Sequence, residues 1–218
     1  MRINQFVAKA TGLGRRKVDK LILSNQITVN DVFASVGQQV GDKDIIKYAN
    51  KIIELPSSFT TILLNKPVNY VCSRNGQGSK TIYDLIPKEY YKLKSIGRLD
   101  KDSSGLIVLT DNGQLSQEMS HPSFNKQKIY QVKLVRNLTS QEIEKLQNGH
   151  IRLDKKPSVL NIKQLEQNLY RVTISEGRNR QIRRTFEKLN IPLTSLNRIQ
   201  FGPYKLNDLK GASWIKLN

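Results

Sequence analysis

A short polar loop with two aspartates offers the best candidate for chemistry in this sequence. Residues 97–105 read Gly-Arg-Leu-Asp-Lys-Asp-Ser-Ser-Gly, and the unbroken apolar run 106–109 follows directly. Such a run predicts a buried strand, which would hold one end of a tight loop and present Asp100 to a substrate. Spacing alone favours turn hydrogen bonds as the role of Asp102 and Ser103, and it leaves the role of Asp100 open.

A second candidate is a cluster of arginines. Residues 177–184 read Gly-Arg-Asn-Arg-Gln-Ile-Arg-Arg, and the apolar residues that follow give this segment the buried stripe of a helix. Arginine favours planar recognition of a phosphate or a carboxylate, whereas the alternative is an ordinary solvated helix face. Because like charges this close repel one another, the cluster favours an anion between its members: Arg178, Arg180, Arg183 and Arg184.

An aromatic residue lies on the inner face of a predicted strand between these two motifs. Residues 128–134 alternate, so that Tyr130, Val132 and Leu134 share one face. A core tyrosine is the default interpretation. The sharper one is a platform on which a nucleic-acid base stacks, since every base offers a π-face to an aromatic ring.

The composition narrows the class of partner. The chain of 218 residues carries 36 Lys and Arg against 18 Asp and Glu, a net charge of +18. Such a charge attracts polyanions, of which nucleic acid is the usual one. A single cysteine and the lack of a signal peptide lead us to expect a cytoplasmic protein. No apolar run approaches the roughly 20 residues that cross a bilayer.

Several classes of site are excluded. His121, His150 and Cys72 are too few for a zinc site of His and Cys ligands, so we expect no metal. The segment Gly-Ser-Lys-Thr at 78–81 lacks the first glycine of a phosphate loop, and no G-x-G-x-x-G opens a helix.

The chain begins with a compact basic module. Helical spacing predicts helices over residues 2–10 and 15–24, followed by short strands near 27–29, 32–34 and 45–48. The basic residues of the helical half face almost no acids, which favours a phosphate-contacting surface over a solvated face. The segments 2–6, 14–18 and 27–30 resemble the small αL-type RNA-binding module, with Asp31 where glycine is usual. The resemblance implies RNA contacts from Arg2, Arg15, Arg16 and Lys17.

A boundary is predicted at Pro56-Ser57-Ser58, which gives domains of 1–58 and 59–218. The first has 9 basic and 5 acidic residues, and the second has 27 and 13, so both are basic. In the second domain we expect strands at 61–64 and 106–110, helices at 114–120 and 139–148, a strand pair at 159–165 and 169–175, and closing strands at 196–203 and 212–217. Thr139 with Glu142 forms a predicted capping box.

Taken together, the motifs at 97–105, 128–130 and 177–184 resemble the three signature motifs of the pseudouridine synthases, in the RsuA/RluB-type ribosomal RNA branch. The resemblance spans nearly the whole chain. It implies an α+β fold, in which the small RNA-binding module precedes a catalytic domain with a mixed, mainly antiparallel sheet flanked by helices. It also implies that Asp100 is the catalytic carboxylate, that Tyr130 lies against the target base, and that Arg183 pairs with the aspartate.

The resemblance implies isomerisation of a uridine to its C-glycoside, which oxidises and adds nothing, so we expect no cofactor. The expected partner is ribosomal RNA with the target uridine in a single-stranded loop or bulge, and the expected state is a monomer. Further candidate contacts to RNA phosphates are Arg98, Arg178, Arg180 and Arg184. Two alternatives stay open: a non-catalytic rRNA-binding or ribosome assembly factor, and an enzyme of this family that acts on tRNA.

Overall fold

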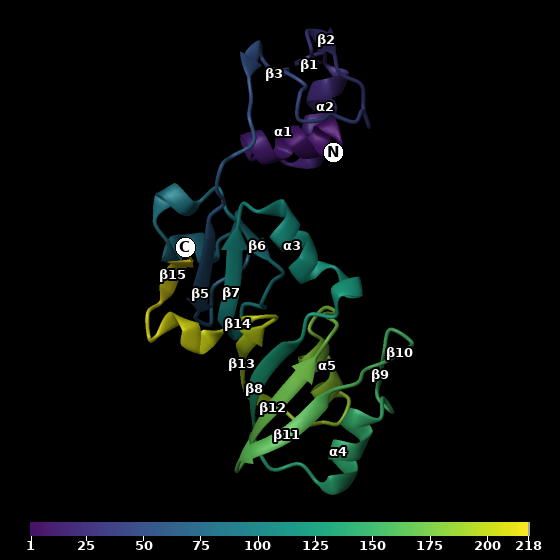
Figure 1. The fold of residues 1–218 in the computed structure, drawn as a ribbon. Helices are drawn as coiled ribbons and strands as arrows, with labels where there is room; N and C mark the ends of the chain where they lie inside the picture. Colours follow the sequence, from purple (N-terminus) through teal and green to yellow (C-terminus); the bar gives the residue numbers. More distant parts are fainter. Residues whose placement is uncertain (218) are drawn as a thin grey trace. The chain divides into compact units, whose positions relative to one another are not determined.

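The computed structural model describes residues 1–217, without the side chain of Pro122, and divides into two compact units. The first comprises Met1–Thr60 with Asp111–Gly113, and the second comprises Thr61–Thr110 and the chain from Gln114 onward. Figure 1 shows the helices and strands of each unit. Within residues 1–217, no helix is both long and apolar enough to cross a membrane.

The first unit packs two helices on a small sheet. Ile3, Val7, Val18 and Ile22 are buried between them, as the predicted helical spacing requires. The sheet has the order β2-β1-β3-β4 and is antiparallel throughout. The elements of this unit are α1 (Ile3–Thr11), α2 (Arg15–Leu23), β1 (Ile27–Val29), β2 (Val32–Phe33), β3 (Ile46–Tyr48) and β4 (Lys51–Ile52).

The second unit is built on a nine-stranded sheet within the described chain, and its central path has the order β11-β12-β8-β13-β7-β5-β15. All of its strand pairs are antiparallel except β13 with β7, which confirms the predicted mixed, mainly antiparallel sheet. Strand β7 is buried on both faces, which explains its unbroken apolar sequence. The strands are β5 (Thr61–Lys66), β6 (Lys94–Ile96), β7 (Ser104–Thr110), β8 (Lys128–Leu134), β9 (Arg152–Leu153), β10 (Lys156–Pro157), β11 (Asn161–Glu166), β12 (Leu169–Ile174), β13 (Leu193–Phe201), β14 (Tyr204–Lys205) and β15 (Trp214–Leu217), of which β9 and β10 form a separate hairpin.

Helices flank this sheet, with α4 beside β11 and α5 near the β9–β10 hairpin (Figure 1). The predicted capping box of α4 is confirmed: the Thr139 hydroxyl accepts from the Glu142 amide, and the Glu142 carboxylate accepts from the Thr139 amide. The hairpin β9–β10 and strand β6 were not predicted, since both are very short. The helices are α3 (Gly113–Ser120), α4 (Ser140–Gln147) and α5 (Gln181–Glu187), with 3₁₀ turns at η1 (Ile82–Leu85), η2 (Lys88–Tyr90), η3 (Pro122–Phe124) and η4 (Leu206–Leu209).

The two halves of the large sheet meet where β7 pairs with β13. Their parallel pairing is only two residues long, Ser104 with Asn197 and Gly105 with Arg198. Gly105 has φ of 106°, and a Cβ at this position would lie 2.3 Å from the Arg198 carbonyl oxygen. Only glycine allows the two backbones to come this close. The loop that precedes β7 is thereby held against β13.

Candidate active site

The loop between β6 and β7 presents Asp100, and its neighbours on both sides are fixed. The buried Leu99 donates its amide to the Cys72 sulfur at 3.4 Å, and the Lys101 carbonyl accepts from the Asn69 amide at 2.7 Å. The Asp100 carbonyl itself accepts from the Ser103 amide, which closes the turn. The Asp100 side chain is 33% exposed. The loop therefore holds a half-buried carboxylate in one position.

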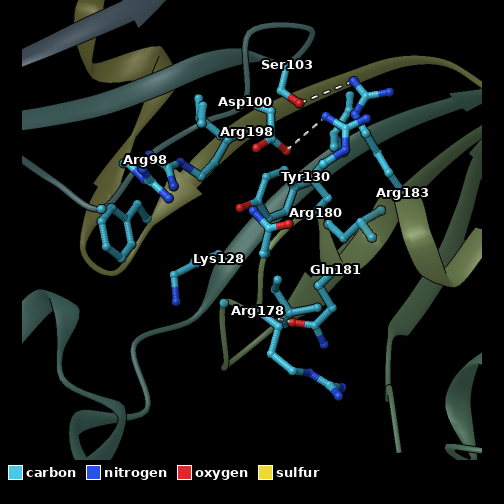
Figure 2. A pocket seen from close by; sticks show the side chains of 18 of the residues that line it. Arg98, Asp100, Ser103, Lys128, Tyr130, Arg178, Arg180, Gln181, Arg183 and Arg198 are labelled. Carbon is cyan, nitrogen blue, oxygen red and sulfur yellow. Dashed lines mark hydrogen bonds and ion pairs between the residues drawn. The ribbon is translucent and has the colours of Figure 1, made fainter. Parts of the chain in front are cut away.

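Two arginines reach this loop, Arg180 from the N-cap of α5 and Arg183 from its first turn, and both bind Asp102. Arg180 donates from Nη1 and Nη2 to the two carboxylate oxygens of Asp102 at 3.1 Å each. Arg183 lies with Nε 3.2 Å from Asp102 Oδ2, and its Nη2 donates to the Asp102 carbonyl at 2.7 Å and to the Ser103 hydroxyl at 3.2 Å. Arg180 is also the arginine nearest to Asp100, with Nη1 3.8 Å from Oδ2. Figure 2 marks this contact and the bond from Arg183 to Ser103.

The prediction that Arg183 pairs with Asp100 is therefore wrong. Arg183 pairs with Asp102, two residues further along the same loop, and it is Arg180 that approaches Asp100. Asp102, predicted to make only turn hydrogen bonds, instead ties the loop to α5. Burial acts to raise the pKa of the Asp102 carboxyl, but the hydrogen bonds from Arg180 and the charge of Arg183 outweigh it, so that this pKa is lowered.

All three predicted catalytic residues line one cavity of about 390 Å³. Tyr130 is buried on β8, where β13 and β12 pair with it on either side, and its side chain shares the cavity with Asp100 and Arg183. Figure 2 shows these side chains around the same space. A carboxylate, an aromatic ring and several guanidinium groups can together hold a planar, electron-rich substrate and act on it.

The remaining arginines of the cluster differ in how they are used. Arg178 lines the cavity but donates to the carbonyls of Leu153, Lys156 and Pro157 and to Glu176, so its guanidinium holds the β9–β10 hairpin. Arg184 lies outside the cavity lining and binds Asp154 of the same hairpin through two bonds, the shorter of 2.6 Å. As contacts to RNA, Arg178 and Arg184 stay predictions.

The other predicted RNA contacts are accessible. Arg98 is exposed and lines the cavity. Arg2, Arg15, Arg16 and Lys17 are exposed in the first unit, in or beside its two helices. Among the described residues, no three His, Cys, Asp or Glu side chains gather closely enough to hold a metal ion.

Comparison with known proteins identifies the family of this chain. Residues 60–188 match the family model described as RNA pseudouridylate synthase. The chain belongs to this family. Its members are isomerases that convert uridine in RNA to pseudouridine.

Relatives of this pseudouridine synthase span nearly its full length. The ribosomal large subunit pseudouridine synthase B of Buchnera aphidicola subsp. Baizongia pistaciae is 31% identical, with 100% of this chain and 93% of the relative covered. The ribosomal small subunit pseudouridine synthase A of Pasteurella multocida is 33% identical, with 95% and 91% covered. A crystal structure of a pseudouridylate synthase superposes with a TM-score of 0.71 at 29% identity, covering 100% of this chain and 96% of that one.

Sequence reasoning also missed two buried cations of this pseudouridine synthase, of which only Arg198 lines the cavity. Lys66, at the end of β5, is fully buried and donates to the carbonyls of Pro67 and Tyr70 at 2.9 and 2.8 Å. Burial lowers the pKa of its ammonium group. Arg198 is buried in the cavity wall beside Lys128. Arg198 follows Leu196 by two residues on β13, so both side chains lie on the same buried face. An arginine at a position where the alternation predicts an apolar residue is the sequence signal that could have identified it.

Proposed function

We propose that this pseudouridine synthase converts one specific uridine of ribosomal RNA to pseudouridine, with Asp100 as its catalytic carboxylate. The observation that carries the proposal is that Asp100, Tyr130 and Arg183 line one cavity. Support for the ribosomal substrate comes from the two relatives named above, which are named for the large and the small ribosomal subunit and align with this chain over nearly all of their length.

The isomerisation breaks the N1–C1′ bond, turns the base and joins C5 to C1′. For this the target uridine leaves its stack and enters the cavity, at a cost of a few kcal/mol. Asp100 reacts there at C1′ or at C6, or removes a sugar proton. Tyr130 holds the detached base by stacking and keeps water away. Arg183 keeps the loop in its active conformation through its bonds to Asp102 and Ser103.

The contacts to the rest of the RNA offset the cost of extruding the base. Arg98 and Arg180, both at the cavity, are proposed to contact phosphates beside the target. Residues 1–58 are proposed to act as an αL-type RNA-binding module, whose exposed Arg15 and Arg16 bind phosphates elsewhere on the substrate. The target is a uridine in a single-stranded loop or bulge, where a base is extruded most easily. The proposed enzyme acts in the cytoplasm. It is proposed to act as a monomer, because one chain supplies Asp100, Tyr130 and Arg183.

Mapping pseudouridines in all cellular RNA tests this function. Cells that lack the gene are expected to lose one pseudouridine in ribosomal RNA, and the wild-type gene is expected to restore it. Asp100→Asn should fail to restore the site while the purified variant binds RNA as well as wild type does. Asp208→Asn, which changes a capping aspartate of η4, serves as the matched control and should restore the site.

Other results would change the assignment. Loss of a pseudouridine in tRNA alone would make tRNA the substrate. An unchanged pseudouridine map, together with a ribosome assembly defect that Asp100→Asn repairs, would favour a non-catalytic assembly factor.

A further inference from the structure

One hydrogen-bond donor of Arg198 has no acceptor in the part of the chain that the structure describes. Its side chain is 1% exposed, and its Nε donates to the Leu106 carbonyl at 2.8 Å. Its guanidinium carbon lies 4.8 Å from the centre of the Phe201 ring. One of its terminal nitrogens, Nη2, is buried and has no partner among the described residues. A buried donor without an acceptor is unfavourable, so this nitrogen is available to an acceptor that a ligand brings.

The charge of Arg198 is also unbalanced. Within residues 1–217, no carboxylate lies within ion-pair distance of its guanidinium. The ammonium group of Lys128 lines the same cavity wall, and its pKa is lowered by burial and by the charge of Arg198. Lys128 is half-buried and has Glu176 nearby, whereas Arg198 is buried without an acidic partner. A buried cation in this setting is favourable beside an electron-rich group.

The position of Arg198 shows which part of a nucleotide it meets. Arg198 pairs directly with Tyr130 across β13 and β8, so the two side chains leave the sheet on the same face. Both line the cavity, as Figure 2 shows for the labelled residues. Arg98 is exposed, and the side chain of Arg180 is 39% exposed, whereas Arg198 is buried. The part of an extruded nucleotide that goes deepest is its base, and its phosphates stay nearer the solvent.

We propose that Arg198 donates a hydrogen bond from Nη2 to a carbonyl oxygen of the extruded uracil and stabilises the base while it is detached. The inference rests on the proposed function. If Asp100 reacts at C1′ or removes a sugar proton, the electron pair of the N1–C1′ bond stays with the base, whose negative charge spreads over N1 and the two carbonyl oxygens. If Asp100 adds to C6, the pair of the C5–C6 double bond moves onto C5 and the C4 carbonyl oxygen, and the pair left on N1 is shared with the C2 carbonyl oxygen. In each case negative charge develops on a carbonyl oxygen of the base. The C5–C1′ bond then uses a pair from the ring, C5 loses a proton and N1 gains one. The hydrogen bond to the Leu106 carbonyl and the contact with the Phe201 ring hold the donor in place before the charge develops.

Single-turnover kinetics of purified protein on protein-free ribosomal RNA and tRNA from the host test this role. Arg198→Lys keeps the charge but loses the fixed planar donor. It should slow the saturating rate by about 10²–10³-fold, as expected for loss of a donor to developing charge. Its Kd for RNA should stay within about twofold of wild type. The control Arg171→Lys makes the same change at an exposed arginine of β12 and should change neither value.

The competing role is a phosphate contact. In that case Arg198→Lys would leave the saturating rate unchanged, and Arg198→Gln would weaken RNA binding and reduce its salt dependence by about one unit of slope. Either of these results, or full activity of Arg198→Lys, overturns the proposal. Wild-type protein that forms no pseudouridine in either RNA removes the proposed function, and this inference goes with it.

A change in the substrate tests the same contact without changing the fold. Synthetic RNA carries 2-thiouridine or 4-thiouridine at the mapped target, because sulfur is a poorer acceptor than oxygen. One of the two should slow the wild-type enzyme by about tenfold, the size of one hydrogen bond, and should slow Arg198→Lys no further. Wild-type rates that are unaffected by both substitutions contradict a carbonyl contact. If Arg198 had only a structural role, the rate losses from Arg198→Lys and from the thio substitution would add in the combined experiment. Losses that do not add exclude a purely structural role.

Discussion

Asp100 and Asp102 lie two residues apart in one loop, yet their surroundings differ. The Asp102 carboxylate accepts two hydrogen bonds from Arg180 and lies 3.2 Å from Arg183. The nearest cation to Asp100 is Arg180, at 3.8 Å. Asp102 therefore neutralises one of the two positive charges that Arg180 and Arg183 bring to the loop and leaves the Asp100 carboxylate available to a substrate. In this arrangement one aspartate ties the loop to Arg180 and Arg183, and the other is the proposed catalytic carboxylate.

Asp102→Asn is expected to lower kcat by about 10- to 100-fold, because the loop and α5 lose their shared ion pairs and Asp100 is less well positioned. It should also lower the free energy of unfolding at pH 7 by about 1 kcal/mol, since the pairs are partly exposed and screened. The pKa of Asp102 is lowered in the folded state, so this stability is present above the unfolded pKa and is lost as the pH falls through the folded value. The stability gap between wild type and variant should therefore shrink below about pH 4.

Steady-state kinetics and urea denaturation between pH 7 and pH 3 measure these effects. Asp208→Asn is the control, because it removes a carboxylate from the η4 cap and leaves the ion pairs of α5 intact. Asp102→Asn protein that turns over RNA as fast as the wild type would show that Asp102 does not position the loop.

At the scale of elements, the site depends on the short parallel pairing of β7 with β13. This pairing brings the Asp100 loop, which runs into β7, next to Arg198 on β13. The pairing is two residues long and one of the two is Gly105, so small changes there act on both elements. Tyr130 is fixed by the same arrangement, because β8 is the other neighbour of β13.

Gly105→Ala is expected to destabilise the protein by about 2–5 kcal/mol. The new Cβ would lie 2.3 Å from the Arg198 carbonyl oxygen and 2.5 Å from Asn197 Oδ1, and the residue has φ of 106°. Overpacking and backbone strain each cost about 1–3 kcal/mol. Gly113→Ala is the matched control: Gly113 is the first residue of α3 and a Cβ there meets no atom within 4 Å, so its stability should equal or exceed that of wild type. Thermal unfolding compares the two variants, and equal melting temperatures would contradict this account of the pairing.

The helices could be predicted from local sequence signals, but few of the contacts between residues far apart in the chain could be predicted. Periodicity and capping signals predicted α1, α2 and α4 to within one or two residues, because those signals lie inside each element. The cavity residues Asp100 and Tyr130 were found because a resemblance joined motifs that lie far apart in the chain. The pairing of Asp102 with Arg180 spans 78 residues, and no local pattern specifies which of two nearby aspartates an arginine binds. Arg198 was missed because its burial depends on three strands meeting.

At the scale of the whole molecule, positive charge is present in both parts of the chain. Residues 1–58 have a net charge of +4 and the remaining 160 residues have +14. In the first unit, the exposed Arg15, Arg16 and Lys17 lie together in the first turn of α2. Lys43 and Lys51 are also exposed there but lie outside the helices. The position of a charge can therefore be tested separately from its amount.

The double variant Arg15→Gln/Arg16→Gln is expected to weaken binding of the full-length protein to its RNA. If both arginines contact phosphates, the slope of log K against log salt should become less steep by about 1.4–1.8, since each lost contact removes about 0.7–0.9. The single-turnover rate at saturating RNA should stay unchanged, because these residues are proposed to bind RNA and take no part in the reaction. Filter binding at several salt concentrations measures the slope.

Lys43→Gln/Lys51→Gln removes the same amount of charge from the same unit and serves as the control. A general attraction between a protein of net charge +18 and a polyanion falls equally in both double variants, because it depends on total charge. If α2 forms a specific contact surface, RNA affinity and the salt dependence decrease more in the arginine variant than in the lysine variant. Equal slopes for the two variants would therefore show that the first unit adds charge but no specific phosphate contacts, and the proposed RNA-binding role of residues 1–58 would have to be abandoned.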